Sequence, residues 1–188
     1  MPTLTRSFEP PESFNLADYF LDQRIVEGHG ERTALRLADR ELSYRQVQAL
    51  ANRMGHVLRH LGVRQEERVM IALPDGAEFV GALFGTLKIG AVVVMVNPHL
   101  KPEEVAALHA YTRPSCVVVH DSVAAGFRDA ITGGEDPLPG ATRWLVVGGP
   151  ETADDSFERL QTQVSDTLEN VATHRDDPAI WLFSGGTT

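Results

Sequence analysis

The sequence has a single cysteine and no long hydrophobic run. One cysteine cannot close an intramolecular disulfide, which excludes the disulfide-rich secreted scaffolds and fits a reducing compartment. Cys116 opens the apolar run at residues 116–119, so we interpret it as a small buried hydrophobe. The longest aliphatic run, at 91–96, is far too short to span a bilayer, and residues 1–11 lack the apolar core of a signal peptide. We therefore expect a soluble, cytoplasmic protein without a membrane partner.

Positive charge is also scarce. The chain has 17 Lys and Arg residues against 26 Asp and Glu residues, which gives a formal net charge of -9. Such a chain has no global field that would attract nucleic acid, so we predict no nucleic-acid partner. An anionic ligand would have to be held by local donors. With 188 residues, 43% of them hydrophobic, the chain is long enough for one sizeable core.

What the sequence does contain is an alternation of helix and strand patterns. The clearest helix opens at Ser43, which has capping-box spacing to Gln46 and precedes an apolar stripe that ends at Gly62. The expected strands are 33–37, 40–42, 68–73, 91–96, 115–119, 143–147 and 179–183, and the other expected helices begin at Asn15, Asp75, Pro102, Ser122 and Ser156. The helix that begins at Ser156 is expected to reach Leu168. Continuous apolar strands between amphipathic helices predict an α/β fold: a doubly wound, mostly parallel sheet with helices on both faces.

The last eight residues favour a phosphate ligand. The apolar run 180–183 predicts a buried strand, which leads directly into Ser184-Gly185-Gly186-Thr187-Thr188. Adjacent glycines let backbone N–H groups face an anion, and hydroxyls add donors to the same oxygens or to Mg²⁺. Ligands of parallel sheets also sit beyond the carboxyl ends of the strands. Glycine-threonine turns after strands are common, however, so the residues alone leave an ordinary turn open as an alternative.

Three other patterns have simpler structural interpretations. His56 and His60 have the spacing of a metal pair, but no third ligand is evident and the helix face is solvated. The Gly81-x-x-x-Gly85 spacing indicates close packing on the sheet. The acidic pairs at 154–155 and 176–177 suit helix caps or solvated loops better than Mg²⁺. We therefore predict no resident metal site and assign no catalytic residue within the chain.

Three stretches in order resemble the adenylate-forming superfamily, which contains acyl- and aryl-CoA ligases, luciferases and peptide-synthetase adenylation domains. Residues 184–188 look like the first half of its phosphate loop, which continues as Gly-x-Pro-Lys. Leu42-Ser43-Tyr44 resembles a segment that opens an early helix, and residues 87–94 resemble its Leu-Lys-x-Gly-Ala segment. Gly185 stands where the family usually has a second hydroxyl residue, which removes one potential phosphate donor.

The resemblance implies a domain division and a set of binding residues. Residues 1–14 would be an N-terminal extension, and 15–188 the N-terminal portion of a large ATP-binding domain that is incomplete at its C-terminus. Ser184, Thr187 and Thr188 would donate hydroxyls to the β- and γ-phosphates of ATP, while Gly185 and Gly186 would let the backbone approach. The implied cofactors are ATP, Mg²⁺ and coenzyme A. The family's catalytic and metal-binding residues lie beyond the phosphate loop and have no counterpart here.

The resemblance also suggests a substrate. Residues 14–22 and Asn97-Pro98 are most similar to benzoate- and hydroxybenzoate-CoA ligases. The complete protein would then join an aromatic carboxylic acid to a thiol through an acyl adenylate, with the remainder of its own chain as a further partner. The resemblance leaves open whether the thiol belongs to coenzyme A or to a carrier protein, and whether the protein is a homodimer. The alternative is a non-enzymatic α/β nucleotide-binding module or one half of a two-chain complex. We expect the 188 residues alone to lack ligase activity, because the last strand would leave an unpaired edge.

Overall fold

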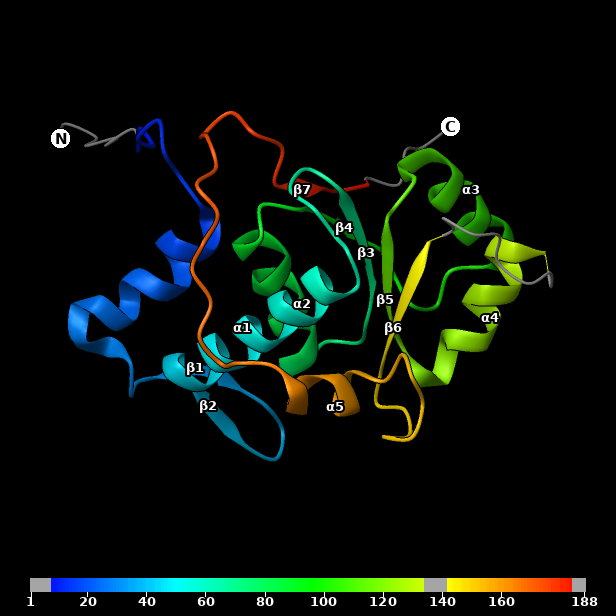
Figure 1. Ribbon diagram of the computed structural model, residues 1–188, viewed down its shortest axis with the longest axis horizontal. Helices are drawn as coiled ribbons and strands as arrows, with labels where there is room; N and C mark the ends of the chain where they lie inside the picture. The colour runs from blue at the N-terminus through cyan, green and yellow to red at the C-terminus, as the bar shows by residue number, and fades with distance from the viewer. Residues whose placement is uncertain (1–7, 134–141, 184–188) are drawn as a thin grey trace, which may run out of the picture.

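The computed structural model describes residues 8–133 and 142–183. At its centre is a five-stranded sheet with the order β6-β5-β3-β4-β7, in which all neighbours pair in parallel (Figure 1). The strands are β3 (Arg68–Ala72), β4 (Val92–Met95), β5 (Cys116–His120), β6 (Arg143–Val147) and β7 (Ile180–Trp181). A separate antiparallel pair is formed by β1 (Thr33–Arg36) and β2 (Glu41–Ser43). All seven strands match runs expected from the sequence, although β7 is only two residues long.

Helices cover both faces of the parallel sheet. The first face packs against α1 (Tyr44–His60), α2 (Ala77–Lys88) and α5 (Phe157–Leu160), and the second against α3 (Pro102–Thr112) and α4 (Asp121–Thr132). Successive residues of β3 alternate between the two cores: Val69 and Ile71 belong to the first, Met70 and Ala72 to the second. The predicted doubly wound α/β fold is therefore confirmed.

Local sequence signals explain how two of these helices begin. Ser43 Oγ accepts a hydrogen bond from the Gln46 N–H (3.3 Å), and Gln46 Oε1 accepts one from the Ser43 N–H (2.8 Å), which confirms the predicted capping box at the start of α1. Pro102 occupies the first turn of α3, where its missing N–H costs nothing. Asn15 also caps as expected, because its Oδ1 accepts from the N–H groups of Ala17 and Asp18. The turns that follow are π-helical: η1 (Asp18–Asp22) and η2 (Ile25–His29).

Two helix predictions were wrong. The helix expected from Ser156 to Leu168 stops at Leu160, is followed by a 3₁₀ turn, η3 (Gln161–Gln163), and gives way to irregular chain. Asp75 does not cap α2, because the N-cap residue is Gly76 and it makes no side-chain capping bond. Phe157, Leu160, Val164 and Leu168 have helical spacing and pack against the first core, but beyond Leu160 hydrogen bonds to α1 determine the path of the chain.

The irregular segment 164–178, which we call the strap, connects the α5 side of the molecule to β7 (orange in Figure 1). Side chains of α1 hold its first part: Asn52 Nδ2 donates to the Asp166 carbonyl (2.6 Å), and His56 Nε2 lies 2.8 Å from the Thr167 carbonyl oxygen. The N-terminal segment holds its second part, where the Phe14 N–H donates to the Thr173 carbonyl (2.9 Å). The strap thereby delivers the chain to the outer side of β4.

Cys116 lies in the middle of the sheet with none of its surface exposed. Burial raises the pKa of its thiol to about 12, although the nearby Arg143 acts in the opposite direction. Thiolate chemistry is therefore suppressed at neutral pH. This confirms the interpretation of Cys116 as a small buried hydrophobe.

Candidate functional site

The candidate site lies at the carboxyl edge of the parallel sheet, where the segments that follow the strands meet. The chain leaves β3 towards α2 on the first face, but leaves β4 and β5 towards α3 and α4 on the second face. Neighbouring connections that turn to opposite faces create a switch point beside β3. In open parallel sheets, such a switch point is where ligands bind.

Three helix amino ends gather at this edge, and each of these helices also carries an acidic side chain in its first turn. Because each helix runs antiparallel to the strands, α2, α3 and α4 all begin here, and helix amino ends carry partial positive charge. At the start of α2, Gly76 supplies no side-chain cap to the first N–H groups. The sequence hid this feature, because the preceding Asp75 is a common capping residue. A glycine directly before the helix was the available signal.

At the opposite, amino edge of the sheet, cations offset the helix carboxyl ends. Arg68 Nε and Nη2 donate to the carbonyl oxygens of Thr112 and Arg113, both at 2.9 Å, at the end of α3. The side chain of Arg143 lies next to Gly62, just beyond α1. These arginines stabilise helix ends and stand away from the switch point.

A hydrogen-bonded turn follows β4 at the carboxyl edge. Asn97 Oδ1 accepts from the His99 N–H (2.9 Å), and the Asn97 carbonyl accepts from the Leu100 N–H (3.2 Å). Since β4 pairs with β7, this turn lies next to the end of β7. The exposed His99 is held in place by its backbone, in keeping with an ordinary turn residue.

The strand expected before the glycine-rich loop is present as β7, but the prediction of a buried strand over 180–183 was wrong, because β7 is half-buried and ends at Trp181, and Leu182 is largely exposed. It pairs with β4 through Val93 and Ile180 and through Val94 and Trp181, and the Val93 N–H donates to the Ala179 carbonyl (2.9 Å). Its carboxyl end is therefore at the same edge as the switch point. The predicted phosphate-binding residues lie outside the described residues: Ser184, Gly185, Gly186, Thr187 and Thr188. Their assignment stays a prediction.

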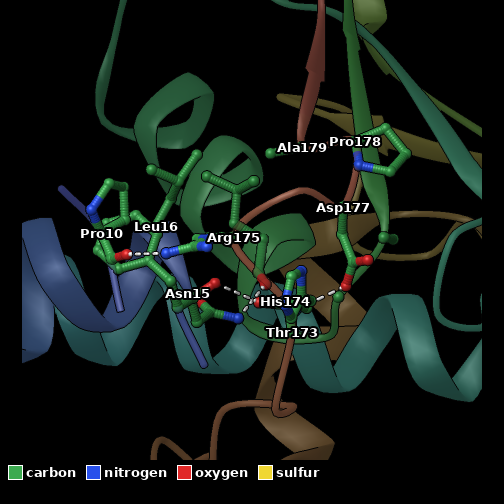
Figure 2. A pocket seen from close by; sticks show the side chains of 13 residues that line it. Pro10, Asn15, Leu16, Thr173, His174, Arg175, Asp177, Pro178 and Ala179 are labelled. Atoms are coloured by element: carbon green, nitrogen blue, oxygen red, sulfur yellow. Dashed lines mark hydrogen bonds between the residues drawn. The ribbon is translucent and has the colours of Figure 1, made fainter. Parts of the chain in front are cut away.

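The strap and the N-terminal segment enclose a different cavity, of about 120 Å³ (Figure 2). Its polar groups are already engaged: Arg175 Nη1 donates to the Pro10 carbonyl (3.1 Å), and Asp177 Oδ2 accepts from the His174 N–H (2.7 Å). Gly90 and Ala179 line it from just before β4 and β7, which places it at the amino edge. We interpret this cavity as a packing seam rather than the ligand site.

The other candidate patterns have structural roles. Within 8–133 and 142–183, no group of three or more His, Cys, Asp or Glu side chains is arranged to hold a metal. Asp154 pairs with Arg159, and Asp155 with Arg128. In the same part of the chain, no helix is long and apolar enough to cross a membrane.

A doubly wound parallel sheet with helix amino ends gathered at a switch point defines a nucleotide-binding type of α/β domain. The sequence profile described as "AMP-binding enzyme" matches residues 22–188, and the chain belongs to this family. This agrees with the resemblance to adenylate-forming enzymes that the sequence motifs indicate.

Known relatives share both sequence and fold. The chain is 34% identical to the 3-hydroxybenzoate–CoA/4-hydroxybenzoate–CoA ligase of Thauera aromatica, over 98% of this chain and 35% of that protein. It is 33% identical to the long-chain-fatty-acid–CoA ligase FadD13 of Mycobacterium tuberculosis, over 80% of this chain and 28% of that protein. The crystal structure of the anthranilate CoA ligase AuaEII in complex with anthranoyl-AMP superposes with a TM-score of 0.84 and 34% identity, over 95% of this chain and 34% of that one. The chain thus spans about a third of the length of these relatives.

Proposed function

We propose that this chain is the N-terminal part of the ATP-binding domain of an ATP-dependent carboxylate–CoA ligase. Residues 15–188 form that part, preceded by an extension at 1–14. The observation that carries the proposal is the family match over 22–188, together with a shared fold with a ligase that binds an acyl adenylate. The switch point at the carboxyl edge of the sheet, where three helices begin, supports it independently.

The proposed chemistry explains why the site needs anion donors and no acid–base pair. A carboxylate attacks the α-phosphate of ATP, pyrophosphate leaves, and the thiol of coenzyme A then displaces AMP from the acyl adenylate. Residues 184–188 hold the β- and γ-phosphates with Mg²⁺ as charges build on the departing pyrophosphate. Ser184, Thr187 and Thr188 donate hydroxyls there, and Gly185 and Gly186 admit the backbone. In this proposal, the described part of the chain positions these residues through β4 and β7.

We propose an aromatic acid as the carboxylate and the cytoplasm as the location. The Thauera aromatica relative acts on hydroxybenzoates, and the AuaEII structure holds anthranoyl-AMP. The similar identity to a long-chain-fatty-acid ligase shows that this third of the sequence discriminates weakly between acids. The choice of an aromatic acid therefore rests on the two aryl relatives.

The first test is the denatured intact mass of every polypeptide in the purified protein, followed by ATP–pyrophosphate exchange with a panel of carboxylic acids. We expect a longer polypeptide and exchange that depends on benzoate, hydroxybenzoate or anthranilate. Thr187→Ala and Thr188→Ala should each lower kcat about 10- to 1,000-fold, because each removes a donor to developing charge. Thr162→Ala is the matched control, since among the described residues its hydroxyl bonds only to the local Arg159 carbonyl. Exchange that survives both loop substitutions unchanged would contradict the proposal.

A further inference from the structure

A polar hollow of about 470 Å³ lies at the amino edge of the sheet, where α3 ends and β3, β5 and β6 begin. We call it the arginine hollow, because Arg68, Arg113 and Arg143 line it together with the acidic Glu67. The chain as a whole carries a formal net charge of -9. The hollow is therefore a local reversal of charge, and it lies at the edge opposite the switch point.

Backbone hydrogen bonds bring the three arginines together. The Ser115 N–H donates to the Arg68 carbonyl (2.9 Å), and the Arg143 N–H donates to the Ser115 carbonyl (3.0 Å). These residues form one row across β3, β5 and β6, with neighbouring strands about 4.8 Å apart. Arg113 follows α3, and its carbonyl accepts from Arg68 Nη2 at 2.9 Å. The paired strands and the end of α3 thus fix the positions from which the three side chains extend.

Two of these guanidinium groups have unused donors. Arg68 is committed to the last carbonyls of α3, and its charge offsets the negative end of that helix. Within residues 8–133 and 142–183, the exposed guanidinium groups of Arg113 and Arg143 form no hydrogen bond and no ion pair. The carboxylate of Glu67 is engaged locally, since its Oε2 accepts from the Arg64 N–H at 2.9 Å. Two arginines are therefore free to bind an anion.

The local backbone also favours these positions for the two arginines. Arg113 ends α3 with a φ of 47°, in the left-handed region where glycine is the usual residue. Non-glycine residues in this conformation are strained and recur at ligand sites. A Cβ added to Gly62 would lie 3.1 Å from Arg143 Nη2 and 3.3 Å from its Cζ, so the glycine leaves the room that this guanidinium occupies.

We propose that the arginine hollow binds a diphosphate group, either as free pyrophosphate or as part of a nucleotide. The planar fork of a guanidinium matches two phosphate oxygens, and the uncommitted Arg113 and Arg143 provide one fork for each phosphate. A monocarboxylate would engage only one of them. This site is separate from the phosphate loop predicted at 184–188, which follows β7 at the opposite edge of the sheet.

Isothermal titration calorimetry of the purified protein tests the site, with inorganic pyrophosphate and ADP as separate ligands at low ionic strength. Arg113→Gly and Arg143→Gln should each weaken one binding event about 10- to 100-fold, because each removes charge-assisted hydrogen bonds. Tighter wild-type binding of pyrophosphate at this site would identify the free anion as the ligand, and tighter binding of ADP would identify a nucleotide.

Arg32→Gln is the matched control for these variants. Arg32 is also exposed and unpaired among the described residues, but it does not line the hollow, so its loss should leave both affinities unchanged. Equal affinities of the wild type and all three variants for both ligands overturn the proposal.

Arg113→Gly also separates a loss of binding from a loss of folding. Glycine adopts a positive φ without strain, so this variant should keep or exceed the wild-type Tm while its binding weakens. Wild-type affinity in Arg113→Gly overturns the proposal. Failure of the proposed function is distinguishable, because it appears as absent carboxylate-dependent pyrophosphate exchange while the effect of Arg113→Gly on binding persists.

Discussion

At the scale of single residues, Lys88 shows how a charge is held inside this protein. Its side chain, at the end of α2, is 1% exposed, and its Nζ donates to Asp22 Oδ2 (2.5 Å) and Asn170 Oδ1 (3.1 Å). Asn170 Nδ2 donates in turn to Asp22 Oδ2 at 2.7 Å. A buried ammonium needs such partners because desolvation would otherwise be prohibitive. Lys88 therefore belongs to the scaffold, and its charge is unavailable to a phosphate.

Replacement of Lys88 by Met should lower the free energy of unfolding by about 3–5 kcal/mol, because Asp22 keeps its charge without a counter-ion. Urea denaturation measures the change. Arg36→Met is the control: its ion pair with Glu41 is largely exposed, and its loss should cost about 1 kcal/mol or less. Equal losses for the two variants would mean that the Lys88 network contributes no more than a surface pair.

At the scale of elements, α1 and α2 are in backbone contact. A Cβ added to Gly85 would lie 2.8 Å from the Ala51 carbonyl oxygen and 2.9 Å from the Gly55 nitrogen. Gly81 of α2 likewise faces Leu50 of α1. The glycine pair does mark close packing, as the sequence indicates, but the neighbour is α1 and not the sheet. The spacing of the glycines identifies which face of α2 packs closely. The element that packs against that face depends on the tertiary fold.

Gly85→Ala should destabilise the protein by about 1–3 kcal/mol, because steric overlap outweighs the gain in helix propensity. Gly126→Ala in α4 isolates the propensity effect, since apart from its own helix backbone and chain neighbours no atom of the described residues lies within 4 Å of the added Cβ. The free energy of unfolding of the Gly126→Ala variant should rise by about 0.5–1 kcal/mol. Both values come from chemical denaturation, and a stabilising Gly85→Ala would refute the close contact.

At the scale of the whole molecule, the strap and the N-terminal segment form one seam. Asn15, which is buried, donates from Nδ2 to the carbonyls of Leu87 (2.9 Å) and Val171 (3.2 Å). Thr173 Oγ1 donates to the Phe14 carbonyl at 2.7 Å. These hydrogen bonds hold the strap, which has no helix or strand hydrogen bonds of its own, and they fix the direction in which the chain enters β7.

Asn15→Ala should lower the free energy of unfolding by about 2–3 kcal/mol, since it removes two buried hydrogen bonds, to the carbonyls of Leu87 and Val171, and a helix cap. Hydrogen exchange should also speed up at the amide of Val171, which bonds to the Lys88 carbonyl. Gln163→Ala serves as the control, because this exposed side chain makes no hydrogen bond within the described ranges. Unchanged exchange at Val171 would show that the seam does not depend on Asn15.

The fold could be predicted where each element carries its own signal. The capping box at Ser43, the proline of α3 and the apolar runs of the parallel strands are all local patterns, so the sequence alone indicates the doubly wound sheet. The strap could not be predicted, because its hydrogen-bond partners in α1, α2 and the N-terminal segment lie at least 82 residues away in sequence. The phosphate loop is a motif that can be recognised without a structure. The uncapped Gly76 and the arginine hollow required one, since each depends on how neighbouring elements are placed.

The seam also determines which parts of the fold can form first during synthesis. Asn15 precedes its partner Val171 by 156 residues. At about 5–20 residues per second, roughly 8 to 30 seconds of synthesis separate the two. Strands β3, β4 and β5 are consecutive in the chain and pair directly with one another, so they can assemble during that interval. The Asn15 amide can bond to the Leu87 carbonyl during that interval, but the seam closes only when the strap arrives together with β7.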